Sequence, residues 1–214
     1  MTRSDAPAYD HAQAAWYEEH HKKNLRTRLT TWRERSLLTR ALASVGPIAS
    51  ILDAPCGSGR FFPVLAHLDG AALTGADNSE GMLDVAARSE SARQRDIRLV
   101  NTSLFATCFA DREFDCVVCL RFLHHLALEY DRRTVLSELR RITRRSVILS
   151  LWVDGNWQAR NRRRHVPTPG FGRRNWIARE AIEREIADSG LSILRHYDVA
   201  PRLSMWRFYM LERT

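Results

Sequence analysis

The segment ILDAPCGSGRF, residues 51–61, decides the fold class of this chain. Its apolar start predicts a buried strand that ends near Ala54, and two glycines, Gly57 and Gly59, follow at a turn into a helix. Such a turn lets the backbone approach a ligand closely and exposes the first amide groups of the helix. A single G-x-G is weak evidence, so the rest of the chain has to support it.

Strand-like and helix-like segments alternate on both sides of this turn. We expect strands at residues 50–54, 71–76, 97–100, 114–120, 146–152, 193–199 and 206–212, and helices at 60–68, 80–92, 131–145 and 177–189. This alternation predicts a doubly wound α/β fold with a mostly parallel, seven-stranded sheet covered on both faces. No helix separates the last two strands, which predicts an antiparallel hairpin at one edge. Ser79 and Asp131 are expected to cap the helices that they precede.

The length of 214 residues favours one domain with additions. Residues 1–46 are predicted to form an N-terminal helical lid or cap, in which Trp16 and Trp32 are interpreted as packing anchors. Residues 47–214 are predicted to form the main domain, with a basic insertion at 154–176. Because the chain has neither an 18-residue apolar run nor an N-terminal signal core, we expect a cytoplasmic protein without a transmembrane segment.

The cysteines and histidines do not show the spacing of a metal site. Cys116 and Cys119 lie within FDCVVCL, residues 114–120, which is typical of a buried strand. Residues three apart on a strand point to opposite faces, so we interpret both thiols as core packing and predict no metal site.

Positive charge is concentrated in the flanks of the chain. Lys and Arg outnumber Asp and Glu by 33 to 25, and residues 155–179 contain seven arginines and no acid. This tract would suit phosphates of nucleic acid or lipid. Arginine outnumbers lysine 31 to 2, however, which also fits a general preference of the genome for arginine codons.

A second carboxylate follows the second expected strand. Asp77 stands twenty residues after Gly57 and suits the paired hydroxyls of a ribose. A nicotinamide cofactor fits poorly, because Phe62 occupies the position of the third glycine in the dinucleotide fingerprint. Asp53, at the exit of the first strand, would also repel a pyrophosphate but attract an ammonium or sulfonium group.

Three ordered segments resemble a known family: ILDAPCGSGRF (51–61), LTGADNSEGML (73–83) and FDCVVCLRFLHHL (114–126). They are similar to the motifs of class I S-adenosylmethionine-dependent methyltransferases, and most similar to the small-molecule branch that includes ubiquinone/menaquinone-type enzymes. The resemblance covers roughly residues 48–153. It implies a Rossmann-like methyltransferase fold and S-adenosyl-L-methionine as the cofactor.

The resemblance also implies roles for individual residues. Asp53 would act on the amino group of the methionine moiety, Asp77 would bind the ribose, and Asn78 and Met82 would flank the adenine. The full set of implied cofactor-binding residues is Asp53, Ala54, Gly57, Gly59, Asp77, Asn78, Met82, Ser103, Leu104 and Leu120. Two positions depart from the pattern: Pro55 stands where the family often has glycine, and Ser103 stands where it commonly has an acid.

Two residues after the fourth expected strand are candidates for catalysis. His124 would serve as the base for an acceptor, or alternatively as a structural residue at the start of a helix. Arg121 would orient an anionic acceptor, or alternatively lie on the surface. Four N-terminal residues are candidates for a lid over the cofactor: Tyr17, His21, Arg28 and Trp32. Four residues on or near the loop after the fifth strand are candidates for acceptor contacts: Trp152, Trp157, His165 and Trp176.

These patterns predict a methyltransferase that acts on a small-molecule or lipid-like acceptor by in-line displacement. One alternative is an RNA methyltransferase that uses the basic tract 155–179, although the chain lacks the D/N-P-P-[YFW] motif after the fourth strand. The other alternative is a catalytically silent partner protein with the same fold. The oligomeric state is left open.

Overall fold

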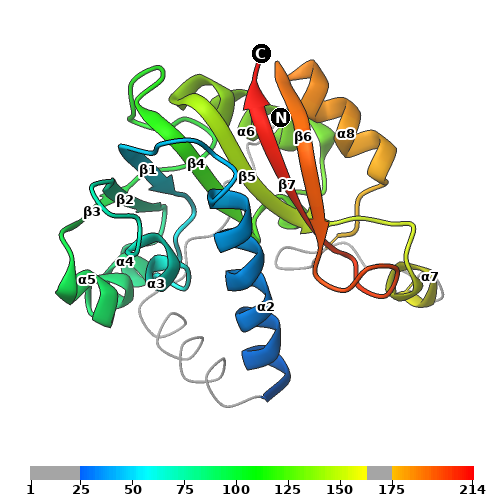
Figure 1. The fold of residues 1–214 in the computed structure, drawn as a ribbon. Helices are drawn as coiled ribbons and strands as arrows, with labels where there is room; N and C mark the ends of the chain where they lie inside the picture. Colours follow the sequence, from blue (N-terminus) through cyan, green and yellow to red (C-terminus); the bar gives the residue numbers. More distant parts are fainter. Residues whose placement is uncertain (1–24, 163–174) are drawn as a thin grey trace.

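The computed structural model describes residues 25–162 and 175–214. Their strands form one seven-stranded sheet with helices packed on it (Figure 1). The order across the sheet is β3-β2-β1-β4-β5-β7-β6. Strands β1 to β5 pair in parallel, and β7 pairs antiparallel with both β5 and β6. The predicted mostly parallel sheet with an antiparallel edge hairpin is therefore confirmed. The strands are β1 (Ser50–Asp53), β2 (Ala72–Asp77), β3 (Ile97–Asn101), β4 (Phe114–Leu120), β5 (Thr143–Trp152), β6 (Leu191–Asp198) and β7 (Trp206–Arg213).

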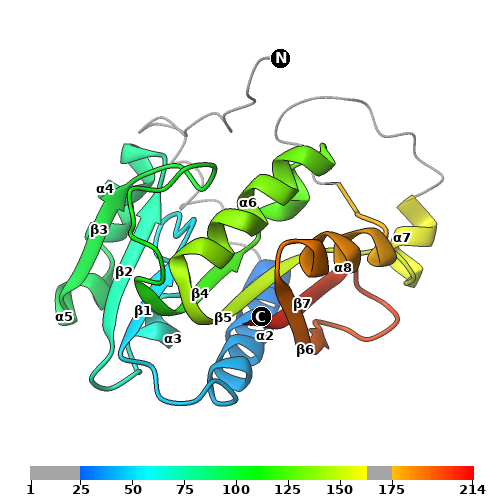
Figure 2. The same cartoon turned by 90° about the horizontal axis from the view of Figure 1, so that it is seen from above.

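Helices cover both faces of the sheet, and Figure 2 shows α2 on one side and α6 on the other. All seven residues of β4 are buried, as expected for a central strand between two helical layers. Cys116 belongs to the core on the α2 side and Cys119 to the core on the α6 side, which confirms that they point to opposite faces. The helices are α2 (Leu25–Leu42), α3 (Phe62–Leu65), α4 (Glu80–Ala87), α5 (Glu90–Gln94), α6 (Glu129–Ile142), α7 (Trp157–Arg162) and α8 (Arg179–Asp188), with a 3-10 turn η1 at Leu123–His125.

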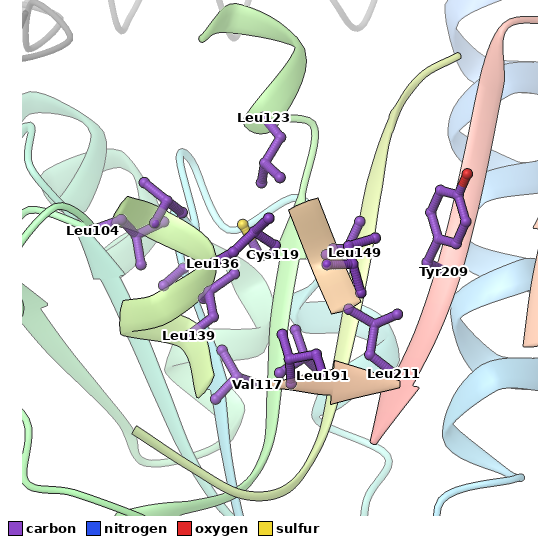
Figure 3. Close-up of a cluster of buried hydrophobic side chains, with 14 of the residues drawn as sticks. Leu104, Val117, Cys119, Leu123, Leu136, Leu139, Leu149, Leu191, Tyr209 and Leu211 are labelled. Carbon is purple, nitrogen blue, oxygen red and sulfur yellow. The ribbon is translucent and has the colours of Figure 1, made fainter. Parts of the chain in front are cut away.

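The larger core lies between the sheet and the layer of α6 and α8 (Figure 3). Leu136 and Leu139 of α6 belong to the same buried cluster as Val117 of β4 and Leu149 of β5. On the opposite face, the second half of α2 packs into the core through residues such as Leu37 and Leu38. None of the helices in the described residues is long and apolar enough to cross a membrane.

Two of the expected helices are shorter or divided in the structure. The helix expected at 60–68 is shortened to α3, with Pro63 in its first turn, and the chain turns back at Gly70, whose φ is +75°. The helix expected at 80–92 is divided into α4 and α5 because the Ser89 hydroxyl accepts a hydrogen bond from the Ala92 amide and starts a second helix. The expected cap at Ser79 is confirmed: its hydroxyl accepts from the Met82 amide at 3.2 Å.

The expectation that Asp131 caps the next helix is wrong. Helix α6 starts at Glu129, and Leu128 occupies the cap position without a side-chain hydrogen bond. Asp131 therefore lies in the first turn, where its negative charge interacts favourably with the positive, N-terminal end of the helix dipole. Strand β5 begins at Thr143, three residues before the expected start, because the backbone is already extended there and pairs with Phe114.

The basic insertion at 154–176 contains a short helix that was expected to be loop. Asn156 explains it, since its side-chain oxygen accepts from the Ala159 amide at 2.9 Å and its amide nitrogen donates to the Val153 carbonyl. Residues 163–174 of this insertion and residues 1–24 of the expected lid lie outside the described residues.

Candidate cofactor and acceptor site

The glycine turn lies between the exits of β1 and β2. The Cys56 amide donates to the Ala76 carbonyl at 2.8 Å, which ties the turn to the end of β2. Gly57 and Gly59 have φ angles of +52° and +75°, a region that other residues rarely adopt. A Cβ atom at Gly57 would meet nothing within 4 Å, so the backbone here faces open space in which a ligand has room.

Phe62, at the position of the missing third glycine, is fully buried and fills the space between the turn and β2. A Cβ atom at Gly59 would lie 2.6 Å from the Phe62 ring, and one at Gly75 would lie 2.7 Å from it. The third glycine of a dinucleotide site allows a helix to pack closely on a strand. Here the Phe62 ring fills that space instead, and Gly59 and Gly75 lie against it.

Asp53 is the last residue of β1, and its carboxylate is completely buried. Among the described residues, no hydrogen-bond donor reaches either of its oxygens. Burial raises the pKa of this carboxyl well above its ordinary value, and the nearby Asp77 raises it further. A buried carboxylate without a partner is costly, which marks it as a place where a cationic ligand group would be stabilised.

Asp77 ends β2 and is held by backbone amides. Its two carboxylate oxygens accept from the amides of Gly57 at 2.9 Å and Ser79 at 3.0 Å. Burial raises the pKa of Asp77, while these amide hydrogen bonds lower it in part. Each carboxylate oxygen can accept a further hydrogen bond, so Asp77 retains capacity for ligand hydroxyls.

A small cavity of about 20 Å³ opens next to Asp77. The structure brings five of the predicted cofactor residues together in its wall: Ala54, Asp77, Asn78, Ser103 and Leu104. Five wall residues were not predicted: Pro55, Ala76, Thr102, Phe105 and Phe122. Thr102 and Phe105 come from a segment without a motif, whereas the other three lie within the quoted motifs but were given no role in binding.

The other five predicted cofactor residues do not line this cavity. Asp53, Gly57 and Gly59 lie at the exit of β1 and in the glycine turn, as described above. Met82 is buried against Val85 in α4. Leu120 is buried in the core beneath α2.

Arg121 is neither a free surface residue nor an open acceptor contact. It follows β4 with a φ of +61°, and its guanidinium nitrogen Nη1 lies 3.0 and 3.1 Å from the two carboxylate oxygens of Glu34. Arg60 of the glycine turn lies 3.9 Å from the same carboxylate. Glu34 on α2 is fully buried and was missed by the sequence analysis, because an acid among exposed helix positions carries no motif.

His124 is buried in an aromatic cluster at the exits of β4 and β5. Its ring stacks on Trp152 at 5.3 Å and meets the edge of Trp206 at 4.9 Å. Trp176 packs against the same tryptophans, and the Arg121 guanidinium lies 4.7 Å from the Trp206 ring centre. The cluster and Asp53 lie at the same edge of the sheet, because the parallel strands β1, β4 and β5 end there.

Of the predicted lid residues, Arg28 and Trp32 lie in the described part of the chain, and both line a groove beside the glycine turn. Trp32 is 66% exposed, so its interpretation as a packing anchor is wrong: the first half of α2 projects beyond the sheet that its second half covers. Trp157 is also exposed. The predicted residues Trp16, Tyr17, His21 and His165 lie outside the described residues.

The comparison with known families decides the identity of the fold. Residues 51–146, from β1 to the first half of β5, match the family described as "Methyltransferase domain". Residues 51–146 thus form a methyltransferase domain, and the sheet has the fold of S-adenosylmethionine-dependent methyltransferases. The cofactor of this domain is S-adenosyl-L-methionine, and the unpartnered Asp53 carboxylate fits the amino group of that molecule.

One curated protein and several solved structures are similar to this chain. A protein of Encephalitozoon cuniculi that carries a methyltransferase name is 26% identical over 162 residues, which are 68% of this chain and 71% of that protein. The magnesium protoporphyrin IX methyltransferase of Synechocystis, solved with bound S-adenosylhomocysteine, superposes with a TM-score of 0.71 at 19% identity and covers 89% of this chain and 88% of its own. A methyltransferase of Clostridium acetobutylicum gives a TM-score of 0.70 at 13% identity, over 93% and 98% of the two chains.

Proposed function

We propose that this methyltransferase acts on a small-molecule or lipid-like acceptor. The observation that carries the proposal is the aromatic cluster of His124, Trp152 and Trp206 at the exits of β4, β5 and the hairpin. Aromatic and apolar walls with a few polar groups are typical of small-molecule sites. The aromatic cluster lies at the same sheet edge as Asp53, where we expect the reactive end of the cofactor.

We assign the holding of the cofactor to the two strand exits. Asp53 would bind the ammonium group of the methionine moiety, Asp77 would bind the ribose hydroxyls, and Asn78 and Ser103 at the small cavity would contact the adenine. When bound, S-adenosyl-L-methionine supplies a methyl group on a positively charged sulfur, which is already an activated electrophile. The chain's own contribution is then alignment and exclusion of water, and alignment can supply on the order of 7–11 kcal/mol.

Isotope transfer tests the acceptor class. The purified protein is incubated with S-adenosylmethionine carrying a labelled methyl group and with a cell extract, which is then separated into lipid, RNA and small polar fractions. Label in the lipid or small polar fraction supports the proposal. Label confined to RNA contradicts it and favours the RNA methyltransferase alternative.

Replacement of the ribose carboxylate gives a direct prediction for the cofactor site. The change Asp77→Ala should weaken binding of S-adenosylhomocysteine about tenfold or more, because it removes a charged hydrogen-bond acceptor. Isothermal titration calorimetry measures the effect. An unchanged dissociation constant would remove Asp77 from the ribose site, and the change Asp69→Ala at an exposed position serves as the control.

His124 is proposed as the base that accepts a proton from the acceptor. The change His124→Gln should then slow turnover by about a hundredfold while leaving the affinity for S-adenosylhomocysteine unchanged. The rate is measured on the acceptor that the isotope experiment finds. A purely structural His124 would behave differently: the melting temperature of the variant would fall while its rate at saturating acceptor stayed normal.

A further inference from the structure

A large positively charged groove runs along the helical layer on the α2 side. It encloses about 1110 Å³ between the exposed half of α2, the glycine turn with α3, and the segment from Arg88 to α5. Glu90 is the only acid among the described residues that line it. Six arginines line it: Arg28, Arg35, Arg60, Arg88, Arg93 and Arg95. None of the described residues of the tract 155–179, in which the sequence alone placed the densest positive charge, lines this groove.

Two of these arginines are fixed by neutral groups. Arg35 donates from Nε and Nη2 to the Arg60 carbonyl at 3.2 and 2.8 Å. Arg95 donates to the carbonyls of Ala66, Leu68 and Ala71. Carbonyl oxygens orient a guanidinium group but do not cancel its charge, so these contacts leave the wall of the groove positive.

Three further arginines present their charge to the solvent. Arg28, Arg88 and Arg93 are exposed, and their side chains form no ion pair with the described residues. A guanidinium group is suited to phosphate because it offers several donors in one plane and remains charged at all physiological pH values. Three such groups around one groove favour a ligand that carries several phosphates.

An exposed aromatic side chain completes the groove. Trp32 lines it and keeps 66% of its surface exposed. A positively charged groove with an aromatic side chain is the combination by which proteins hold single-stranded nucleic acid, because bases stack on the ring while cations track the backbone. A planar lipid surface would contact a protruding face rather than the inside of a groove.

We propose that this groove binds the phosphate backbone of a single-stranded nucleic acid, with Trp32 stacking on a base. Arg28, Arg88 and Arg93 contact the phosphates, while Arg35 and Arg95 supply fixed positive charge. The inference goes beyond the proposed methyl transfer, since it assigns a binding surface and requires no methylation of the bound strand.

The test measures binding of a fluorescent oligouridine of about 12 nucleotides by anisotropy over a series of salt concentrations. The groove variant carries Arg28→Gln, Arg88→Gln and Arg93→Gln. The control variant carries Arg112→Gln, Arg184→Gln and Arg195→Gln at exposed positions outside the groove, so both lose the same charge. A third variant, Trp32→Ala, tests the stacking. All measurements are made without cofactor, so the result does not depend on catalytic activity.

The groove variant should lose about a hundredfold in affinity at about 50 mM salt, and its salt slope should become shallower by about two, since each phosphate contact on a single strand contributes roughly 0.7. The control variant should stay close to the wild type. Trp32→Ala should weaken binding about tenfold without changing the slope. Equal losses in the two triple variants would overturn the proposal. So would binding to phosphatidylserine vesicles but not to the oligonucleotide.

Discussion

The change Asp53→Asn is expected to weaken S-adenosylhomocysteine binding about a thousandfold. It keeps the size of the side chain and removes the only charge at the exit of β1 that would meet the ligand's ammonium group. Truncating one partner of a buried charge pair costs roughly 2–5 kcal/mol. Calorimetry measures the affinity, and Asp69→Asn, at an exposed position, is the matched control.

The same variant should be more stable than the wild type in the absence of cofactor. Because burial raises the folded-state pKa of Asp53, the folded protein binds its proton more tightly than the unfolded chain does. The free energy of unfolding therefore falls as the pH rises above the ordinary value of 3.8 toward the raised pKa. Asn at this position removes that pH-dependent loss.

Thermal melts of cofactor-free protein between about pH 5 and pH 8 check the sign of this effect. Relative to Asp53→Asn, the wild type should lose stability as the pH rises toward the raised pKa of Asp53 and lose no more above it. Excess S-adenosylhomocysteine should raise the melting temperature of the wild type but not of the variant. Unaltered affinity in the variant would remove Asp53 from the cofactor site.

The change Glu34→Ala should lower the free energy of unfolding by about 4 kcal/mol. It leaves the Arg121 guanidinium, now 3.0 Å from a Glu34 oxygen, without its counter-charge in a largely buried position. Breaking a buried ion pair by removing one partner is strongly destabilising, by roughly 3–5 kcal/mol. Urea denaturation measures the change.

A double-mutant cycle with Arg121→Ala provides the control for Glu34. If the two residues act as a pair, the double variant should be less destabilised than the sum of the single variants, since no unpaired charge from this pair remains. Additive losses would show that Glu34 contributes through packing alone. The cycle also measures how strongly α2 is attached to the exit of β4.

Much of the candidate site could be predicted from the sequence because it follows local rules. Gly57, Gly59, Asp53 and Asp77 stand directly at strand ends, and the exits of parallel strands meet at one edge of the sheet. The cap at Ser79 and the opposite orientation of Cys116 and Cys119 likewise follow from helix and strand periodicity. The second capping serine, Ser89, carried a readable signal for the break between α4 and α5 that the expected continuous helix ignored.

The sequence by itself thus determined the order of the elements, the mostly parallel sheet and the positions of Asp53 and Asp77 at its edge. Each of these depends on residues that are near one another in the sequence. Only the tertiary structure decided what surrounds them. The Glu34–Arg121 pair joins residues 87 positions apart, and the arginine groove is assembled from segments near residues 28–35, 58–67 and 88–95. Burial and the sum of charges depend on which surfaces meet, and no local pattern encodes that.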